Sequence, residues 1–243
     1  MRTAIITGAS SGIGAATAIA LGKAGFNVVL AARSIDKLEI LKNELESEGI
    51  KAIAVKADVV KRDDMQNLAA AALKEFGNID ILVNNAGIMP LSFMKNLHQD
   101  EWDKMIDVNI KGVLNGVAAV LPTMMENKRG HIINISSVAG VKVFPSSTVY
   151  SGTKWAVEAI TEGLRMELSK NFNLRTTVIR PGATESNLTS TITDAEVGSL
   201  FAAMEIEAIK AEDIANAIVY AASQPENVNV NEILVRPTSQ DLL

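Results

Sequence analysis

The sequence predicts a single α/β domain in which a doubly wound parallel sheet of seven strands carries helices on both faces. Two observations support this prediction. Short β-branched runs alternate with longer helical patterns along the whole chain, and strict alternation of this kind indicates βαβ units. Most of the strand runs are almost continuously apolar, as expected of parallel strands that are covered on both faces. With 243 residues, the chain is long enough for one large domain of this class.

The predicted strands are short and carry few charges. They cover Thr3–Thr7, Asn27–Ala32, Ala52–Ala57, Ile79–Asn84, Gly130–Ser136, Arg175–Arg180 and Glu232–Val235. The predicted helices lie between these strands and cover Ile13–Ala24, Ile35–Glu48, Asp63–Phe76, Glu101–Glu126, Val149–Lys170 and Glu212–Ala222. Residues 184–210 do not follow the alternation. They come after the carboxyl end of a strand, where open α/β sheets bind ligands, so we expect a substrate lid there.

Composition excludes several classes of function. The 48% hydrophobic and 21% charged content is typical of a soluble globular protein, and the net charge of −5 argues against a nucleic-acid partner. The absence of cysteine excludes disulfides, Cys-ligated metals and a thiol nucleophile. His98 and His131 have no ligand spacing around them, so we expect surface or loop roles and no metal site.

The sequence also predicts a cytoplasmic protein with no membrane partner. A strand begins at the N-terminus, which leaves no room for a charged and apolar signal segment. No apolar run reaches membrane-spanning length, because the nearest candidate, Val113–Leu121, stops at Pro122.

A glycine-rich turn joins the first strand to the first helix. Gly8, Gly12 and Gly14 suit a tight turn, a close approach of the backbone to a pyrophosphate, and a helix N-terminus with free N–H donors. The alternative is an ordinary glycine-rich loop. The strand before the turn and the helix after it favour dinucleotide binding. The predicted contacts in this turn are Gly8, Ser10, Ser11, Gly12, Ile13 and Gly14.

Tyr150 and Lys154 lie four residues apart in a predicted helix and therefore share one face. A phenol with a pKa near 10 is poorly matched to proton transfer at neutral pH. An ammonium about 5 Å away, at an effective dielectric of about 20, stabilises the phenolate by about 3 kcal/mol, or about two pKa units. The spacing therefore suits a phenol that exchanges a proton with a carbonyl or alcohol oxygen. Ser137 precedes Tyr150 by thirteen positions and, taken alone, is a hydroxyl at the end of a strand.

In this order and at this spacing, the glycine-rich turn, Ser137, Tyr150 and Lys154 resemble the short-chain dehydrogenase/reductase family over nearly the whole chain. The resemblance implies a Rossmann-type domain and an enzyme that moves hydride between a nicotinamide cofactor and a carbonyl or alcohol. It also implies that Ser137 orients the substrate carbonyl, that Tyr150 is the general acid/base and belongs to the cofactor site as well, and that Lys154 contacts the nicotinamide ribose. Asn109, in Asp107-Val108-Asn109, matches the Asn that helps to hold a proton-relay water in relatives.

The resemblance places Ala32 where NAD-dependent relatives carry an acid, and Arg33 follows it. A carboxylate there would repel a 2′-phosphate, whereas an Arg can bind it through a bidentate, charge-assisted contact. The pair therefore predicts NADP(H) as the cofactor. The alternative is a solvated Arg that opens a turn.

Further cofactor contacts rest on the resemblance alone. Asp58-Val59 matches the adenine contact, although helix capping explains Asp58 equally well. Asn84 opens an N-N-A-G motif whose role in relatives is partly structural, and Pro181-Gly182 matches the motif beside the nicotinamide. Ser186 stands where a Thr is more usual. The positions implied in these motifs are Asp58, Val59, Asn85, Ala86, Gly87, Pro181, Gly182 and Ser186.

The substrate is less constrained. The C-terminal residues 231–238 lack the ending typical of 3-oxoacyl carrier-protein reductases and look more like the branch of clavulanate dehydrogenase and the NADP-dependent 3-hydroxy acid and serine dehydrogenases. Apolar residues near the predicted site favour a hydrophobic or aromatic carbonyl compound, although core packing explains several of them; they are Ile88, Met89, Val141, Val143 and Phe144. Lys142 either attracts an acidic substrate or is solvated.

We carry two classes of function. The first is an NADPH-dependent carbonyl reductase. The alternative within this class is a dehydrogenase that acts mainly on a 3-hydroxy acid or a serine-like alcohol. The second is a non-catalytic regulator that senses NADP(H). The intact Ser137, Tyr150 and Lys154 argue against the regulator, because a sensor has no use for a tuned phenol.

We also expect a homotetramer. Relatives pair the two long helices that follow strands four and five, and here both helices carry apolar residues on more than one face. The residues that suggest surplus apolar surface are Met105, Val108, Val113, Val117, Val120, Trp155, Ala159, Leu164 and Leu168. The alternative is that these side chains pack under loops.

Overall fold

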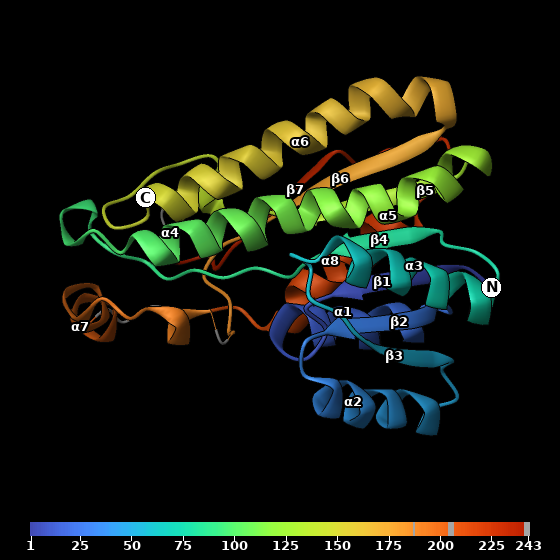
Figure 1. Cartoon of the computed structure of the whole chain (residues 1–243), viewed down its shortest axis with the longest axis horizontal. Helices are drawn as coiled ribbons and strands as arrows, with labels where there is room; N and C mark the ends of the chain where they lie inside the picture. Colours follow the sequence, from blue (N-terminus) through green and yellow to red (C-terminus); the bar gives the residue numbers. More distant parts are fainter. Residues whose placement is uncertain (187, 204–206, 241–243) are drawn as a thin grey trace.

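A seven-stranded sheet in the order β3-β2-β1-β4-β5-β6-β7 forms the centre of the protein (Figure 1). The computed structural model describes residues 1–186, 188–203 and 207–240. All neighbouring strands in the sheet are parallel. The strands are β1 (Thr3–Thr7), β2 (Asn27–Ala32), β3 (Ala52–Lys56), β4 (Ile81–Asn84), β5 (Gly130–Ile135), β6 (Leu174–Pro181) and β7 (Glu232–Val235). The predicted doubly wound sheet is confirmed.

β1, β2 and β7 begin and end at the predicted residues, and the other four strands differ by one or two residues at an end. Differences of one or two residues are the usual uncertainty in where a strand ends. His131 departs from expectation. It lies in β5 and is 1% exposed, so the surface or loop role is wrong. A central strand that is covered on both faces leaves its side chains no path to water.

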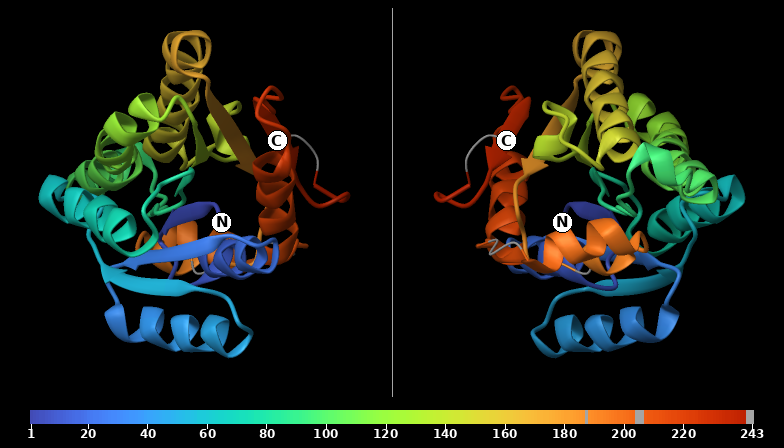
Figure 2. Two further views of the ribbon diagram at one scale, coloured as in Figure 1. Left: turned by 90° about the vertical axis from the view of Figure 1, so that its right-hand side faces the viewer. Right: turned by 90° about the vertical axis from the view of Figure 1, so that its left-hand side faces the viewer.

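The helices cover both faces of the sheet (Figures 1 and 2). They are α1 (Gly12–Lys23), α2 (Ile35–Ser47), α3 (Arg62–Phe76), α4 (Gln99–Ile106), α5 (Gly112–Glu126), α6 (Thr148–Phe172), α7 (Ala195–Ala203) and α8 (Ala211–Ser223). One apolar cluster packs α1, α2 and α8 against the sheet. A second packs α3, α5 and α6 against the opposite face. Two separate cores, one on each face, are what a doubly wound sheet requires.

α4 and α5 form one continuous helix through a π-helical turn, η2, at Asp107–Lys111. The helix runs through Pro122 and ends at Glu126, so the predicted end of the 101–126 helix is confirmed. It is 28 residues long and contains an 18-residue window with a mean hydropathy of 1.2, so by length and composition alone it could cross a membrane, which the apolar run 113–121 did not indicate. Its residues Val117, Val120 and Met124, however, pack against the sheet, which is the position of a core helix.

Residues 184–210 contain structure that the sequence pattern did not predict. A short 3-10 turn, η4 (Thr189–Thr191), precedes α7, and a bridge joins Thr184 to Ile209. Residues 187 and 204–206 of this stretch lie outside the described residues. α7 is only nine residues long, too short to show a clear helical period.

Candidate active site

The glycine-rich turn is shaped to admit a phosphate-bearing ligand. Gly8 and Gly12 have φ of +66° and +53°, a left-handed conformation that favours glycine. A Cβ on Gly14 would lie 2.3 Å from the Gly8 carbonyl oxygen, whereas one on Gly12 would meet nothing closer than 3.6 Å. The turn therefore packs tightly at its base and stays open above Gly12. Ser11 caps α1 without a side-chain hydrogen bond, which leaves N–H donors of the first turn for an anion. These features fit a dinucleotide pyrophosphate.

The N-N-A-G motif is joined to this turn by hydrogen bonds. Thr7 Oγ1 accepts from the backbone N–H groups of Asn85, at 3.0 Å, and Ala86, at 3.1 Å. The Asn85 side chain donates to the Thr7 carbonyl at 2.9 Å. Asn84 instead donates to Asn134 Oδ1 at 2.9 Å inside the sheet. Asn84 is thus structural. Asn85 and Ala86 face the turn, whereas Gly87 faces Asn109 and Lys154.

The end of β2 presents a cation. Ala32 is 9% exposed at the last position of the strand, and Arg33 follows it as an exposed residue. No carboxylate occupies either position. An exposed guanidinium at the carboxyl edge of the sheet suits a phosphate on the adenosine ribose.

Asp58 and Val59 are engaged within the chain. Asp58 Oδ1 accepts from the Val60 N–H at 3.2 Å, and the Val59 carbonyl accepts from Asn115 Nδ2 at 2.8 Å. Asp58 therefore closes the turn that leads to α3, the kind of role that competed with the adenine contact. Val59 also packs against Gly112, where a Cβ would lie 2.7 Å from its side chain.

Asn109 sits in the π-helical turn and is 1% exposed. Its Oδ1 accepts from the Ile88 N–H at 2.9 Å, and its Nδ2 donates to the Ile88 carbonyl at 2.9 Å and to Thr153 Oγ1 at 3.1 Å. One amide thereby holds the loop after β4 and the catalytic helix α6 together. A π-turn inserts one residue into the helix, and such turns often mark functional sites.

Tyr150 lies on α6 facing the end of β5, and it is 5% exposed. The Ser137 side chain lies close enough to the phenol to lower its pKa. Ser137 caps a 3-10 turn, η3 (Val138–Gly140), and its Oγ accepts from the Ala139 N–H at 3.1 Å. Burial raises the pKa of Tyr150 to about 12, and the Ser137 side chain opposes that rise. The phenol is therefore protonated at neutral pH and stands beside a second hydroxyl.

Lys154 lies one turn along α6 and is 6% exposed. Its Nζ is 5.8 Å from the centre of the Tyr150 ring and donates to the Ile135 carbonyl at 2.8 Å. Burial lowers the pKa of Lys154 to about 8, and the charge of Glu158 opposes that change. At pH 7 the ammonium is thus largely charged, and at its distance from the ring it stabilises a phenolate by about 3 kcal/mol at a dielectric of about 20.

Pro181 ends β6, and Gly182 is covered by C-terminal residues that the sequence motifs did not indicate. A Cβ on Gly182 would lie 2.3 Å from Gln240 Oε1 and 2.5 Å from Arg236 Cβ. Gln240 also accepts from the Ala183 N–H at 2.9 Å. No sequence pattern could have revealed these contacts, because they join segments more than fifty residues apart. Ser186 lies across from the open side of Gly12, so its hydroxyl stands beside the glycine-rich turn.

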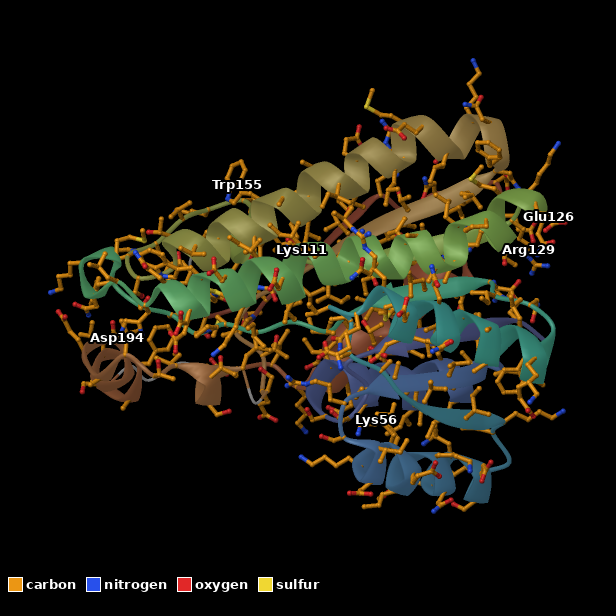
Figure 3. All side chains as sticks on the ribbon, in the orientation of Figure 1. Lys56, Lys111, Glu126, Arg129, Trp155 and Asp194 are labelled. Atoms are coloured by element: carbon orange, nitrogen blue, oxygen red, sulfur yellow. The ribbon has the colours of Figure 1, made fainter. Side chains whose placement is uncertain are left out.

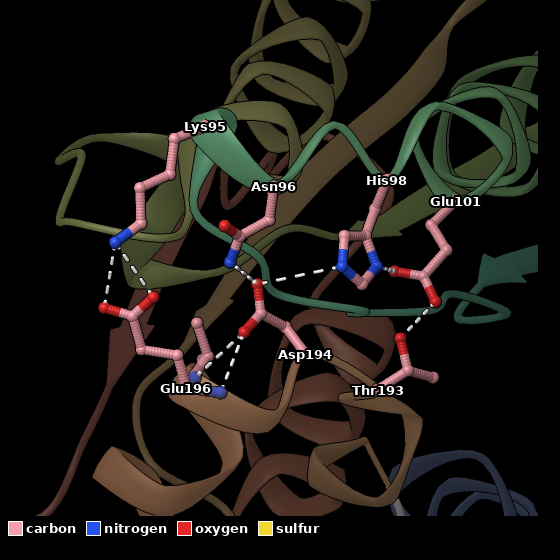
Figure 4. A network of polar contacts seen from close by, with 8 residues as sticks. Lys95, Asn96, His98, Glu101, Thr193, Asp194 and Glu196 are labelled. Atoms are coloured by element: carbon pink, nitrogen blue, oxygen red, sulfur yellow. Dashed lines mark hydrogen bonds and ion pairs between the residues drawn. The ribbon is translucent and has the colours of Figure 1, made fainter.

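Polar contacts hold α7 to the loop before α4 (Figure 4). Asp194 Oδ1 accepts from the Glu196 and Val197 N–H groups at the start of α7. Its Oδ2 accepts from Asn96 Nδ2 at 2.7 Å and lies 3.9 Å from His98 Nε2. Asp194 therefore both caps α7 and anchors it to the body of the protein.

Taken together, the Ser137 hydroxyl, the Tyr150 phenol and the Lys154 ammonium converge at the carboxyl edge of the sheet, on the side of the glycine-rich turn. The buried phenol and serine can bind one oxygen atom through two hydroxyl groups. The ammonium can stabilise the phenolate left by proton transfer. The arrangement suits reversible proton exchange with a carbonyl or alcohol oxygen.

Comparison with known proteins identifies the family to which the chain belongs. Residues 2–197 match the family model for short chain dehydrogenases. An uncharacterized oxidoreductase of Staphylococcus saprophyticus is 49% identical over 242 residues, which cover 99% of this chain and 98% of that protein.

Two solved structures extend the comparison. A closed serine dehydrogenase complexed with NADP+ has a TM-score of 0.90 at 30% identity and covers 99% of this chain and 96% of that one. A short chain dehydrogenase/reductase of Burkholderia phymatum in complex with NAD has a TM-score of 0.88 at 28% identity, covering 96% of this chain and 88% of that one. With the family model matched over most of its length, this chain belongs to the short chain dehydrogenase family of oxidoreductases.

Proposed function

We propose that the protein is an NADPH-dependent reductase that converts a ketone or aldehyde to an alcohol, reversibly. The observation that carries this proposal is the buried Tyr150 phenol, with the Ser137 side chain beside it and the Lys154 ammonium 5.8 Å from its ring centre. Bound NADPH would supply the hydride. In the proposed reaction Tyr150 donates the proton to the carbonyl oxygen, Ser137 holds that oxygen, and Lys154 stabilises the phenolate and binds the nicotinamide ribose.

NADPH oxidation with a panel of ketones, aldehydes and 3-keto acids tests the proposal. Turnover with at least one carbonyl is the expected result. No turnover with any of them, together with tight NADPH binding, would favour the alternative of a non-catalytic NADP(H)-sensing regulator. The buried Tyr150 phenol disfavours that alternative, because a sensor does not need a proton donor.

We infer an apolar or aromatic carbonyl substrate from the surroundings of Tyr150. The phenol belongs to an apolar cluster with Leu91, Ala139 and Val197, against which Ile88, Met89 and Phe144 also pack. A closed apolar wall favours substrates without charge near the carbonyl. The likeness to a serine dehydrogenase supports the second candidate, a 3-hydroxy acid or serine-like alcohol, and the 3-keto acid arm of the panel distinguishes the two.

Arg33 should give the enzyme its preference for NADP(H) over NAD(H). Arg33→Ala is expected to raise the Michaelis constant for NADPH at least tenfold, which corresponds to about 1.4 kcal/mol, and to change that for NADH little. The reason is that only NADPH carries the 2′-phosphate that the guanidinium would bind. Kinetics with both cofactors provide the measurement, with Arg165→Ala, an exposed residue on α6, as the control. Equal use of the two cofactors by the unmodified enzyme would contradict the assignment.

Residues 184–210 are proposed to be a lid that becomes ordered when cofactor and substrate bind. Hydrogen exchange in 188–203 should slow when NADPH is added, because α7 has one buried side chain, Val197, and its polar contacts lie near its start, from Asp194 to Asn96 and from Glu196 to Lys95. Asp194→Ala should speed exchange in α7 and leave α8 unchanged. Strong protection of this segment in the free enzyme would contradict the proposal.

We propose a cytoplasmic homotetramer, on surface residues that differ in part from those predicted from the sequence. Met105, Val113, Val117, Val120 and Leu168 are buried within the chain, so they leave no surplus surface, whereas Trp155 is exposed as predicted. Further exposed apolar side chains on the same long helix pair are Ile106, Leu114 and Met166. Trp155 is 50% exposed and projects from α6 away from the sheet (Figure 3).

Light scattering at micromolar concentration tests this assembly. A mass near four times 25.9 kDa is expected, because apolar surface of this kind on a helix pair usually marks an interface. Trp155→Lys should shift the mass toward smaller species. A mass near one chain for the unmodified protein would rule the tetramer out.

A further inference from the structure

A partly buried ion pair lies behind the proposed catalytic residues. Arg180 Nε donates to Glu158 Oε1 at 3.0 Å, and its Nη2 donates to Glu158 Oε2 at 2.9 Å. Both side chains are only 15% exposed. A planar guanidinium that meets a carboxylate through two parallel bonds fixes the relative orientation of the two groups.

The positions of the two partners connect three parts of the candidate site. Glu158 is four residues after Lys154 on α6, one turn further along the same face. Arg180 is the last residue before Pro181 and Gly182 at the end of β6. The Glu158 carboxylate also lies over Gly140, where a Cβ would be 2.9 Å from its Oε1, so it closes the turn that begins at Ser137.

A third group anchors the pair to the edge of the sheet. Arg180 Nη1 donates to Glu232 Oε2 of β7 at 2.6 Å. Glu232 is 61% exposed, and water screens its contribution. The less exposed contact between Arg180 and Glu158 is therefore the stronger link between α6 and β6.

Resting on the proposed function, we propose that Glu158 and Arg180 are positioning residues that fix the catalytic helix against the turn Pro181-Gly182 and place a negative charge one helical turn from the Lys154 ammonium. Neither residue touches the reacting atoms. They act through Lys154 and through the distance between Tyr150 and the nicotinamide side of the site.

The charges around Lys154 support this role. On α6, Lys154 lies near Tyr150 and Glu158. Burial lowers the pKa of Lys154, and the negative charge of Glu158 opposes that change. The groups that reach its Nζ from other elements are neutral: the Ile135 carbonyl of β5, and the backbone at Gly87, where a Cβ would lie 3.7 Å from Nζ. Arg180 and Glu232 act on Lys154 from behind Glu158.

The first test is the titration of Lys154 in the cofactor-free protein, followed by side-chain NMR and assigned with Lys154→Gln. In Glu158→Gln the pKa of Lys154 should fall by about 0.5 to 1 unit, because a nearby negative charge is lost while Arg180 remains. In Arg180→Gln the pKa of Lys154 should rise, because Glu158 loses its counter-charge and its negative charge then acts more strongly on the Lys154 ammonium. Opposite shifts distinguish this electrostatic role from a purely structural one, which would move both variants alike.

Glu162→Gln is the matched control. Glu162 lies one turn further along α6 and forms a similar two-bond contact with Arg165, but on the exposed surface. It should leave the Lys154 titration unchanged. Circular dichroism of all variants checks folding, and the comparison of Glu158→Gln with Arg180→Gln gives the direction of each shift.

The second test is kinetic. The loss of kcat/KM for carbonyl reduction at alkaline pH should begin at lower pH in Glu158→Gln, because the Lys154 ammonium deprotonates earlier. Arg180→Lys keeps the charge but not the two-bond contact. It should therefore keep the alkaline limb in place and lower kcat about three- to tenfold.

The outcomes separate the two proposals. An unmodified enzyme that reduces no carbonyl compound overturns the proposed function, while the NMR titration still decides the electrostatic role. A Lys154 pKa that is the same in Glu158→Gln, Arg180→Gln and the unmodified protein overturns the positioning pair.

Discussion

Tyr150→Phe is expected to lower kcat for carbonyl reduction by about 10²- to 10⁴-fold, the usual contribution of a positioned general acid. The ring stays in the apolar cluster around Leu91 and Ala139, and only the hydroxyl beside Ser137 is lost. The proton donor therefore disappears without a cavity. NADPH binding should change by less than about twofold, because the ring and the Lys154 ammonium remain in place.

Steady-state kinetics and a fluorescence titration with NADPH provide the two measurements. The chain offers a matched control, because its other tyrosine, Tyr220, is 57% exposed on α8. Tyr220→Phe should leave both quantities unchanged. Turnover near normal in Tyr150→Phe would mean that the catalytic assignment is wrong.

Lys154→Ala should lower kcat/KM at pH 7 by at least about 10²-fold and also weaken NADPH binding. The ammonium stabilises the phenolate by about 3 kcal/mol, which corresponds to about two pKa units of Tyr150. The proposed contact with the nicotinamide ribose is lost in the same variant. Damage to both steps separates this residue from Tyr150, whose removal affects only the chemical step.

The pH dependence of the Lys154→Ala defect follows from the pKa of about 8. Below that value the unmodified enzyme keeps the positive charge, and above it the charge is lost, so the advantage over the variant should shrink about tenfold between pH 7 and pH 9. Lys111→Ala, which removes an exposed ammonium paired with Asp107, is the control. A ratio that stays constant over this range would contradict a role for the charge.

Much of the fold and part of the candidate site can be predicted from the sequence, because both rest on local patterns. Apolar runs of strand length specify the seven strands, since a parallel strand covered on both faces has no polar side. The glycines at 8, 12 and 14 mark a turn that side chains would block, and the close approach of Gly14 to the Gly8 carbonyl bears this out. Tyr150 and Lys154 share a face because the helical period places them there.

The nine-residue helix α7 and the π-helical turn at Asp107–Lys111 were missed for a related reason. Each is too short or too irregular to leave a period in the sequence. Of the apolar residues that the sequence suggested as surface on the long helices, Trp155 is exposed, but Met105, Val113, Val117, Val120 and Leu168 are buried. Which face of a long helix meets the sheet depends on how that helix is rotated in the fold.

The sequence by itself determined the sheet, the glycine-rich turn and the spacing of the catalytic residues. Only the tertiary structure decided what surrounds them. Asn109 binds the backbone of Ile88, Asp194 ties α7 to Asn96, and Arg180 binds Glu158 behind the catalytic helix. Each of these contacts joins residues that are 21 or more positions apart in the sequence. Their partners are brought together by long-range packing of the sheet and helices, which leaves no periodic signal in the chain.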